Sequence, residues 1–328
     1  MLGNIIQDNI IFLISAIISF GLTLVGILGF AKYLPKDHGR EFAVNGALSK
    51  GKARGAGLIL ILALIISCVI CLPLNLEYLI YLVALFVEMM SGYLDDASEK
   101  PWGELKKGLI DFVVAVGVSV TVYYFHGGAI LLPIFGLEAI ISAPVYIILG
   151  VILIWASINV TNCSDGVDGL CASLSIVSLM SIFLLMRIAN HFISNFTSES
   201  AMLFVWIVIL MLVAYLWFNC SPSSILMGDA GSRAIGLFLA MAFMLSGMPV
   251  LFIPCALLLI LDGGLGLVKL TILRVTKSKS FMKNIRTPIH DHARKNKHWS
   301  DTQVVIRFVL LQSLLSMAVI LSVNYLIN

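Results

Sequence analysis

Charged side chains are scarce in this 328-residue chain. Asp, Glu, Lys and Arg together make up 12% of the residues, while 60% are hydrophobic and the mean hydropathy is +1.02. A soluble domain carries about a quarter of its residues as charged side chains, so this composition excludes a soluble protein. No fixed-period repeat and no low-complexity tract is present. The apolar runs are therefore the main guide to the fold.

The chain also lacks the marks of a disulfide framework, a redox centre and a cleaved leader. Its six cysteines are scattered, mostly within apolar runs. Cys68 and Cys71 match a C-x-x-C pattern but have no partner pair, which indicates packing cysteines. The first apolar run has neither a basic start nor a small-residue cleavage site, so we expect a retained helix.

Long apolar runs dominate the sequence. A helix needs about 20 mainly apolar residues to cross a hydrocarbon core that is roughly 30 Å thick. Ten runs qualify, centred on residues 10–31, 56–74, 78–93, 108–125, 139–158, 169–187, 202–218, 233–248, 250–268 and 304–326. They leave short loops and one longer segment near 269–303. We predict an all-α, polytopic membrane protein with about ten transmembrane helices, in which residues 1–328 form a single domain.

Basic residues are missing from alternate loops. Of the 21 Lys and Arg residues, all except Arg187 fall in the loops after odd-numbered runs or at their edges. Since Lys and Arg accumulate in cytoplasmic loops, those loops are predicted to be cytoplasmic and both termini to lie outside. The net charge of +3 therefore reflects sidedness and gives no indication of nucleic-acid binding.

Asp95 and Asp96 follow the third run at its cytoplasmic end. They are either a polar helix end or a functional pair. Acidic side chains at a helix C-terminus oppose the helix dipole, which favours function. Neighbouring helical residues point about 100° apart, so one carboxylate is predicted to hold Mg²⁺ and the other to face a lipid phosphate or a lysine. Lys106 and Lys107, in the same loop, are the candidate lysines.

Residues 159–170 form the strongest polar motif. Asp165 and Asp168 are three positions apart, which places them on one face of a helical turn, and Asn159 and Asn162 repeat that spacing. Glycines between them allow close approach of a ligand to the backbone. The spacing and terminal Glu of a calcium-binding EF-hand are missing. A plain loop between two apolar helices has no need of this set.

Two further motifs lie at the ends of apolar runs. Asp229, in Met-Gly-Asp-Ala-Gly-Ser at residues 227–232, is either a helix N-cap or a Mg²⁺ ligand beside a phosphate. Asn219, at the end of the seventh run, is a candidate for binding a nucleobase or sugar amide. His290 and His292 follow Pro288. Structural zinc sites usually have four ligands, so these imidazoles are interpreted as phosphate-binding groups or, alternatively, as a solvated pair.

The ninth run contains a buried acid and a glycine-rich stretch. Asp262 lies within apolar sequence, where an ionisable group indicates a functional or helix-packing site. Helical spacing of apolar residues continues to about residue 275. We therefore expect the ninth helix to extend beyond the membrane, with a break near residues 263–266.

Taken together, these motifs resemble the polyprenyl-phosphate N-acetylhexosamine-1-phosphate transferase superfamily, whose members have about ten spans and a cytoplasmic active site. The paired aspartates match Asp95 and Asp96, and the Asn-x-x-Asn-x-x-Asp-Gly-x-Asp-Gly-Leu motif matches residues 159–170. Met-Gly-Asp-x-Gly-Ser matches residues 227–232, preceded by Trp-Phe-Asn at 217–219. The resemblance extends from Asp95 to Phe308.

The C-terminal motifs are similar to the phospho-N-acetylmuramoyl-pentapeptide transferase branch. Pro-Ile-His-Asp-His at 288–292 is followed by Trp-Ser-Asp at 299–301 and Val-Val-Ile-Arg-Phe at 304–308. That branch usually has three consecutive histidines, whereas Asp291 replaces the middle one here. Its first-loop motif Lys-x-Gly-Thr-Pro-Thr-Met-Gly-Gly is only loosely matched by residues 50–57, which leaves Lys50 and Lys52 as alternatives for the functional lysine.

The resemblance implies transfer of phospho-N-acetylmuramoyl-pentapeptide from its UDP form to undecaprenyl phosphate, with release of UMP and formation of lipid I at a bacterial cytoplasmic membrane. It implies Mg²⁺ as cofactor, membrane lipid as surroundings and a homodimer. The implied catalytic residues are Asp95, Asp96, Asp229 and His290, with Asp229 and Asn162 on the metal. The implied substrate-binding residues are Lys52, Lys106, Asn159, Asn162, Asp165, Asp168, Asn219 and His292.

Three alternatives stay open. A related transferase would use UDP-N-acetylglucosamine as donor. The reaction would proceed either by direct attack of the lipid phosphate or through a covalent aspartyl-phosphate. A secondary transporter would instead need ionisable groups at mid-membrane and repeated, broken helices, whereas Glu88, Asp111 and Asp262 are the acids within the runs and no repeat is present.

Overall fold

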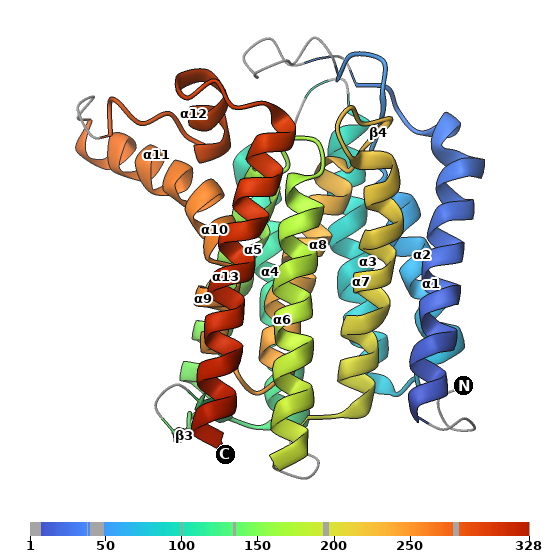
Figure 1. The fold of residues 1–328 in the computed structure, drawn as a ribbon, viewed down its shortest axis with the longest axis vertical. Coiled ribbons are helices and arrows are strands. Elements are labelled where there is room, and N and C mark those ends of the chain that lie inside the picture. The colour runs from blue at the N-terminus through green and yellow to red at the C-terminus, as the bar shows by residue number, and fades with distance from the viewer. Residues whose placement is uncertain are drawn as a thin grey trace.

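The computed structural model describes residues 8–37, 39, 49–98, 100, 102–133, 136–192, 197–277 and 282–327. This described part is a bundle of long helices that run along a common direction (Figure 1). In chain order the elements are α1 (Asp8–Phe30), the 3₁₀ turn η2 (Ala31–Tyr33), β1 (Ala53–Arg54), α2 (Gly57–Cys71), α3 (Leu76–Asp96), α4 (Glu104–His126), β2 (Ala129–Leu132), β3 (Leu137–Ile140), α5 (Ala143–Ser164), α6 (Leu170–Phe192), α7 (Glu199–Asn219), β4 (Ile225–Leu226), α8 (Gly228–Leu245), the 3₁₀ turn η5 (Pro249–Leu251), α9 (Phe252–Cys255), α10 (Leu257–Leu259), the π-helical turn η6 (Ile260–Gly264), α11 (Leu265–Thr276), α12 (Ile289–Asn296) and α13 (Asp301–Ile327).

Each of the ten predicted spans coincides with helical structure. Within the described residues, eight helices are long and apolar enough to cross a membrane, or nine when the broken stretch around Ala256 is taken as one. The remaining run, α2, has 15 residues, which at 1.5 Å per residue extend for only about 22 Å. The all-α, polytopic membrane fold is therefore confirmed, with eight to nine full-length spans.

The ninth helix is broken, but earlier than predicted. The axes of the stretches Pro249–Cys255 and Leu257–Thr276 differ by 69°, so the sharp bend lies at Ala256. The predicted glycine stretch begins in the π-helical turn η6 and continues into α11. Helical structure continues to Thr276, as expected, and α11 projects away from the bundle (Figure 1). That this extension lies beyond the membrane stays a prediction.

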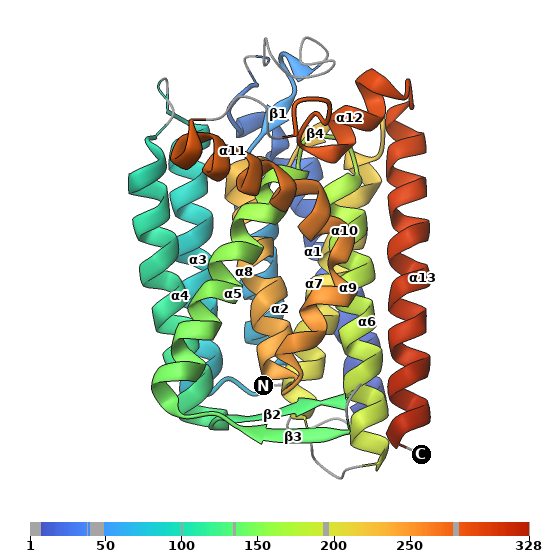
Figure 2. The same ribbon diagram turned by 90° about the vertical axis from the view of Figure 1, so that its left-hand side faces the viewer.

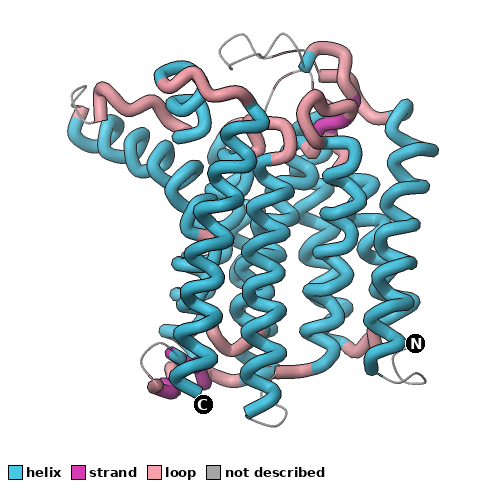
Figure 3. The backbone as a smooth tube through the Cα atoms, viewed as in Figure 1, coloured by secondary structure: helices cyan, strands magenta, loops and turns pink. Residues whose placement is uncertain are grey.

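Short strands mark the two ends of the bundle. The antiparallel hairpin β2–β3 lies at the end where α1 begins and α13 ends (Figure 2). The predicted fifth span started at residue 139 and was wrong at that boundary, because the hairpin occupies the position and α5 begins at Ala143. At the other end, β1 and β4 pair in parallel beside α12, among most of the loop structure (Figure 3).

Helix α8 is the centre of the bundle. Every residue of α8 except Asp229 is buried, and the helix packs against α2, α3, α5 and α6. Small residues allow helices to approach closely inside a membrane. A Cβ added at Gly57 would overlap the backbone nitrogen of Gly231, and one at Gly92 would overlap the carbonyl oxygen of Asp229. Backbone contact therefore fixes α2 and α3 against the start of α8.

We expect Gly92→Ala to damage both stability and activity. The added methyl group must push α3 away from α8, and overpacking of this kind costs about 1–3 kcal/mol. Displacement of Asp229 by about 1 Å is expected to lower the turnover of the transfer reaction that the sequence motifs imply by about 10²-fold. Thermal unfolding in detergent and turnover are the measurements.

Gly117→Ala is the matched control. Gly117 is an exposed glycine of α4 with no atom within 4 Å of an added Cβ. Alanine there should leave both measurements unchanged or raise the unfolding temperature slightly. Equal behaviour of the two variants would contradict the importance of the α3–α8 contact.

Candidate active site

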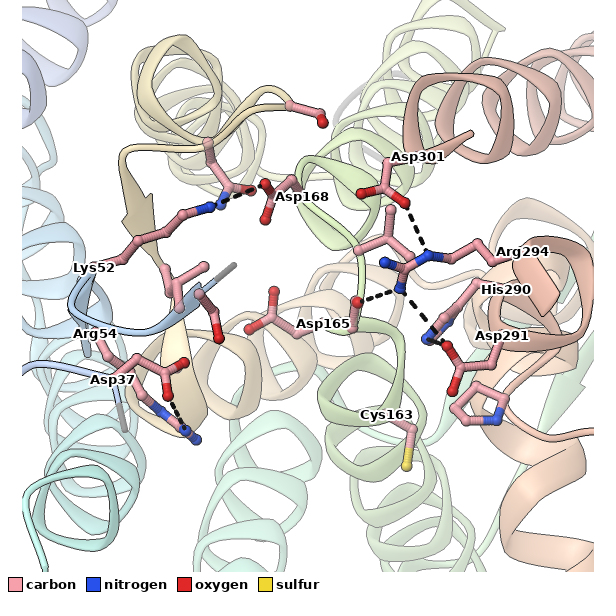
Figure 4. Close-up of a pocket in the computed structure, with 18 of the residues that line it drawn as sticks. Asp37, Lys52, Arg54, Cys163, Asp165, Asp168, His290, Asp291, Arg294 and Asp301 are labelled. Carbon is pink, nitrogen blue, oxygen red and sulfur yellow. Dashed lines mark hydrogen bonds and ion pairs between the residues drawn. The ribbon is translucent and has the colours of Figure 1, made fainter. Parts of the chain in front are cut away.

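A polar cavity of about 560 Å³ opens at the β1–β4 end of the bundle (Figure 4). Four segments far apart in the sequence form its wall: the first loop, the turn between α5 and α6, the segment from α7 to α8, and the segment that leads through α12 to α13. The lining residues are Asp37, Ser49, Lys52, Arg54, Asn162, Cys163, Asp165, Gly166, Val167, Asp168, Asn219, Ser221, Pro222, Leu226, Gly228, Pro288, His290, Asp291, Arg294 and Asp301.

The turn between α5 and α6 brings two predicted carboxylates into the cavity. Asp165 and Asp168 both line it. Asp168 Oδ2 accepts a hydrogen bond from the backbone nitrogen of Ser223 at 2.9 Å and lies 3.5 Å from Lys52 Nζ, which also donates to Ser223 Oγ at 3.0 Å. Lys52 is therefore the first-loop lysine that lines the cavity, whereas Lys50 is exposed and does not.

Asn219 supports the cavity wall. Its Oδ1 accepts a hydrogen bond from the backbone nitrogen of Gly169 at 2.9 Å, and its Nδ2 donates to the carbonyl oxygen of Ile225 at 2.9 Å. Both ends of this buried amide are thus engaged. The side chain joins the Asp165–Asp168 turn to β4, and it borders the cavity as it does so.

His290 is held by Asp262, the buried acid of the ninth apolar run. Asp262 Oδ1 accepts from the backbone nitrogen of His290 at 2.7 Å, and Oδ2 lies 2.8 Å from His290 Nδ1. Both side chains are buried. A carboxylate at Nδ1 fixes the orientation of an imidazole, and the other ring nitrogen, Nε2, lies 3.8 Å from Asp291 Oδ1 and packs against Gly166, both residues of the cavity lining. Asp262 is therefore a positioning residue for His290.

The substituted position of the C-terminal motif forms an ion pair. Asp291 Oδ1 lies 3.7 Å from Arg294 Nη1, which donates to the carbonyl oxygen of Gly166 at 3.2 Å. Arg294 Nε also contacts Asp301 at 2.8 Å. Arg294 thus joins α12 to the turn of Asp165 and to the start of α13 (Figure 4).

Three further acids meet at the edge of the cavity. Lys107 Nζ contacts Asp95 and lies 3.0 Å from Asp229 Oδ2. Arg54 Nε donates to Asp96 at 2.8 Å, and its Nη2 lies 3.6 Å from Asp229 Oδ1. The three carboxylates come from the ends of α3 and α8, and the two cations hold them together. We call Asp95, Asp96 and Asp229 with Arg54 and Lys107 the acidic cluster.

Asp96 is fixed by the first turn of α8. Its side chain is fully buried, and Oδ2 accepts from the backbone nitrogen of Ala230 at 3.1 Å. A Cβ on Gly228 would overlap that oxygen, which explains the glycine of the Met-Gly-Asp motif. Asp229 itself does not cap the helix, since its carboxylate faces Lys107 and Arg54.

The donor set at Asp229 fits Mg²⁺ only together with a phosphate. In the described part of the chain no group of three or more His, Cys, Asp or Glu is arranged to hold a metal ion. Mg²⁺, however, is commonly bound through one or two carboxylates plus substrate phosphates and water. Asp37 lies 4.0 Å from Arg54, so four carboxylates face the two cations Arg54 and Lys107. This excess of negative charge favours a further cation, and Asn162, whose Nδ2 donates to Ser232 Oγ at 2.9 Å, also forms a side-chain hydrogen bond with Asp229, so this amide is the neutral group that would join Asp229 at the ion.

Three predicted substrate-binding residues lie outside the cavity lining. Lys106 is exposed, with Nζ 3.1 Å from the centre of the Trp102 ring, and it is Lys107 that reaches the acids. Asn159 donates to the carbonyl oxygen of Trp155 at 2.8 Å within α5. His292 Nδ1 accepts from the backbone nitrogen of Arg286 at 3.3 Å. Their roles in binding stay predictions.

Sequence analysis did not identify Arg54 and Arg294 as site residues. They lie in the basic segments between apolar runs, where the cytoplasmic bias of Lys and Arg already accounts for every basic residue. Lys107 carried a usable signal. Asp111 follows it by four residues and so shares its helix face, and Asp111 is buried.

Helices of this length and hydropathy, with a cavity of charged side chains at one end, define a polytopic membrane protein whose polar site lies at one end of the helix bundle.

The sequence profile of glycosyl transferase family 4 matches residues 78–247. The phospho-N-acetylmuramoyl-pentapeptide-transferase of Treponema pallidum (strain Nichols) is 35% identical over 308 residues, which cover 90% of this chain and 85% of that protein. The protein of the same name from Helicobacter pylori (strain Shi470) is 27% identical, covering 82% and 80%, and that of Borrelia hermsii is 30% identical, covering 58% and 57%. The chain therefore belongs to glycosyl transferase family 4, in its phospho-N-acetylmuramoyl-pentapeptide-transferase branch.

Proposed function

We propose that the protein transfers phospho-N-acetylmuramoyl-pentapeptide from its UDP-linked donor to undecaprenyl phosphate, giving lipid I and UMP for peptidoglycan synthesis. The observation that carries the proposal is the acidic cluster at the edge of the polar cavity, in a chain that is 35% identical over 308 residues to a phospho-N-acetylmuramoyl-pentapeptide-transferase. A soluble nucleotide and a lipid phosphate can meet at such an edge.

The reaction joins two anions, so the site must supply positive charge. An oxygen of the lipid phosphate forms a bond to the phosphorus that carries the sugar. The bond from that phosphorus to the oxygen of UMP breaks, and its electron pair leaves with UMP. Asp95, beside Lys107, is the residue that orients the lipid phosphate or accepts its proton. Asp165, Asp168 and Lys52, which line the cavity, bind the donor, and His290 directs its imidazole toward donor phosphate.

Asp229 and Asn162 would hold Mg²⁺ together with the donor diphosphate. When bound, the ion would neutralise charge on the diphosphate and on UMP as leaving group. The donor set fits on the grounds of charge and oxygen chemistry given above, and Mg²⁺ dependence is part of the proposal.

The lipid chain of the acceptor has a suitable place within the bundle. An apolar cavity of about 370 Å³ is lined by residues of α5, α8, α9 and the β2–β3 hairpin, and its lining includes Val160 and Ile260. Val160 is one helical turn before Cys163 and Ser164, at the polar end of α5. An isoprenoid bound there would bring its phosphate toward the acidic cluster.

The remaining parts of the proposal concern location and assembly. The distribution of Lys and Arg supports a cytoplasmic site and outer termini, and the start of α1 and the end of α13, which lie at the same end of the bundle (Figure 1), agree with an even number of crossings. We further propose the bacterial cytoplasmic membrane as its location and a homodimer as its assembly.

The test is release of UMP by the purified protein in detergent with undecaprenyl phosphate and Mg²⁺. Two donors are compared, UDP-N-acetylmuramoyl-pentapeptide and UDP-N-acetylglucosamine. We expect turnover with the first donor and less than about one hundredth of that turnover with the second. A site whose polar groups bind the donor rejects a donor that leaves those groups unpaired, and the discrimination can reach about 10⁴-fold. Turnover with the second donor alone would assign the protein to another branch.

A further inference from the structure

The first loop brings two cations to the cavity. Both Lys52 and Arg54 line it, and Figure 4 shows them on the same segment of the first loop. Lys52 directly precedes β1, and Arg54 is the last residue of that strand. This strand is fixed in place, because β1 pairs with β4 and the backbone nitrogens of Ala56 and Gly57 donate to the carbonyl oxygens of Leu226 and Met227. The first loop is therefore held against the residues that lead into Asp229.

The two cations differ in how far they are already engaged. Lys52 Nζ donates to Ser223 Oγ and faces Asp168. Arg54 donates through Nε to Asp96, but its Nη2 lies 3.6 Å from Asp229 and its Nη1 lies 4.0 Å from Asp37. Separations of 3.6 Å or more are too long for a hydrogen bond. Among the described residues, therefore, these carboxylates are too far away to accept hydrogen bonds from Nη1 and Nη2 of Arg54, and both groups can donate to a ligand.

Arg54 also lies at the boundary of the two halves of the site. It lines the cavity with 20% of its side chain exposed, whereas Asp96 behind it is fully buried. The guanidinium is therefore the member of the acidic cluster that lies between the cavity and the buried carboxylate of Asp96. Burial opposes its charge, but the carboxylates of Asp96, Asp229 and Asp37 outweigh that effect and raise the pKa of Arg54 above its ordinary value. The side chain is a permanent cation.

We propose that Arg54 is a catalytic residue that binds the sugar-bearing phosphate of the UDP-linked donor and stabilises it during transfer. The assignment rests on the proposed function. Nε stays on Asp96 and keeps the plane of the guanidinium fixed, while Nη1 and Nη2 donate to non-bridging oxygens of the phosphorus under attack. These oxygens gain no bond and lose none. They carry the charge that moves as the lipid oxygen bonds and UMP departs with its electron pair.

An arginine suits this task better than a lysine would. Its planar fork offers two parallel donors to one phosphate, whereas an ammonium group acts as a point charge. The same charge also repels a metal ion near Asp229. Removal of Arg54 is therefore expected to weaken transfer and, at the same time, to strengthen binding of a divalent cation.

The experiment compares Arg54→Lys and Arg54→Ala with the wild type. We expect turnover to fall by about 10²–10³-fold in Arg54→Ala, as for loss of one transition-state donor, and to fall in Arg54→Lys as well. KM for undecaprenyl phosphate should stay within about twofold, because the acceptor binds through other residues. Added guanidinium ion should restore part of the turnover of Arg54→Ala. The affinity for Mn²⁺ without substrate, measured by electron paramagnetic resonance, should rise in Arg54→Ala.

Arg187→Ala is the control, because Arg187 is an exposed residue of α6 at the far end of the bundle. Normal turnover of both Arg54 variants, or a loss that guanidinium ion does not relieve and that accompanies only a lower unfolding temperature, would reduce Arg54 to a structural ion pair. A wild-type protein that releases no UMP from either donor would overturn the proposed function itself. An active wild type with unaffected Arg54 variants would overturn this assignment alone.

Discussion

Asp229→Asn is expected to lower UMP release by at least about 10²-fold, the cost of removing one preorganised charge that acts on the transition state. Asp229 is the one residue of α8 that is not buried, and its two oxygens face Arg54 and Lys107. It is also the carboxylate that we assign to Mg²⁺. Asparagine keeps the shape but removes the charge, so the loss should persist at every Mg²⁺ concentration.

The measurement is turnover as a function of Mg²⁺ concentration, with Mn²⁺ binding as a second readout. Glu138→Gln is the control, because Glu138 is an exposed acid of β3 at the opposite end of the molecule. If Asp229→Asn kept the Mg²⁺ response of the wild type, the metal would have to be held elsewhere.

Arg233→Met is expected to destabilise the protein by about 3–5 kcal/mol, the usual cost of leaving a buried charge without its partner. Arg233 is 3% exposed and lies one turn below Asp229 on α8. Its Nε donates to Glu88 of α3 at 2.9 Å, and its Nη2 contacts Asp111 of α4. Without the guanidinium, two carboxylates would face each other inside the bundle.

Thermal unfolding in detergent measures the effect. The variant that also carries Glu88→Gln and Asp111→Asn should recover most of the loss, since it removes all three charges together and breaks no pair. A single Arg233→Met variant as stable as the wild type would show that the triad contributes little. Because Glu88, Asp111 and Arg233 lie on the three helices that also carry Asp95, Lys107 and Asp229, turnover should fall along with stability.

Much of the fold was predictable because hydrocarbon imposes a strong length rule. Ten apolar runs coincide with helical structure, and the polar motifs at their ends gave most of the cavity, including Asp165, Asp168 and His290. The bend at Ala256 was missed because the prediction followed the glycines at 263–266, although Pro254, two residues before the bend, is itself a helix-breaking residue.

The main obstacle to predicting the site residues was that the sequence does not give the rotation of each helix about its own axis. Lys106 and Lys107 are adjacent residues of the same type, and the packing of α4 directs Lys107 to the acids and Lys106 to Trp102. Asp111, four residues after Lys107, was the local signal for this difference. Asn219 shows another limit. A polar side chain beside a cavity can be a ligand for substrate or a support for the wall. Hydrogen bonds to Gly169 and Ile225 give Asn219 a supporting role, while its predicted binding of substrate stays a prediction. Long-range pairing such as that of β1 with β4 leaves no local pattern.

That pairing bears on when the protein acquires its site during synthesis. Lys52 and Ser223, which it brings together, are 171 positions apart, and Asp301 completes the wall still later. At about 5–20 residues per second of synthesis, the first loop waits on the order of ten seconds for its partner strand. A nascent chain that stops short of β4 therefore has no strand for its first loop to pair with, and it lacks Asp229, the last carboxylate of the acidic cluster.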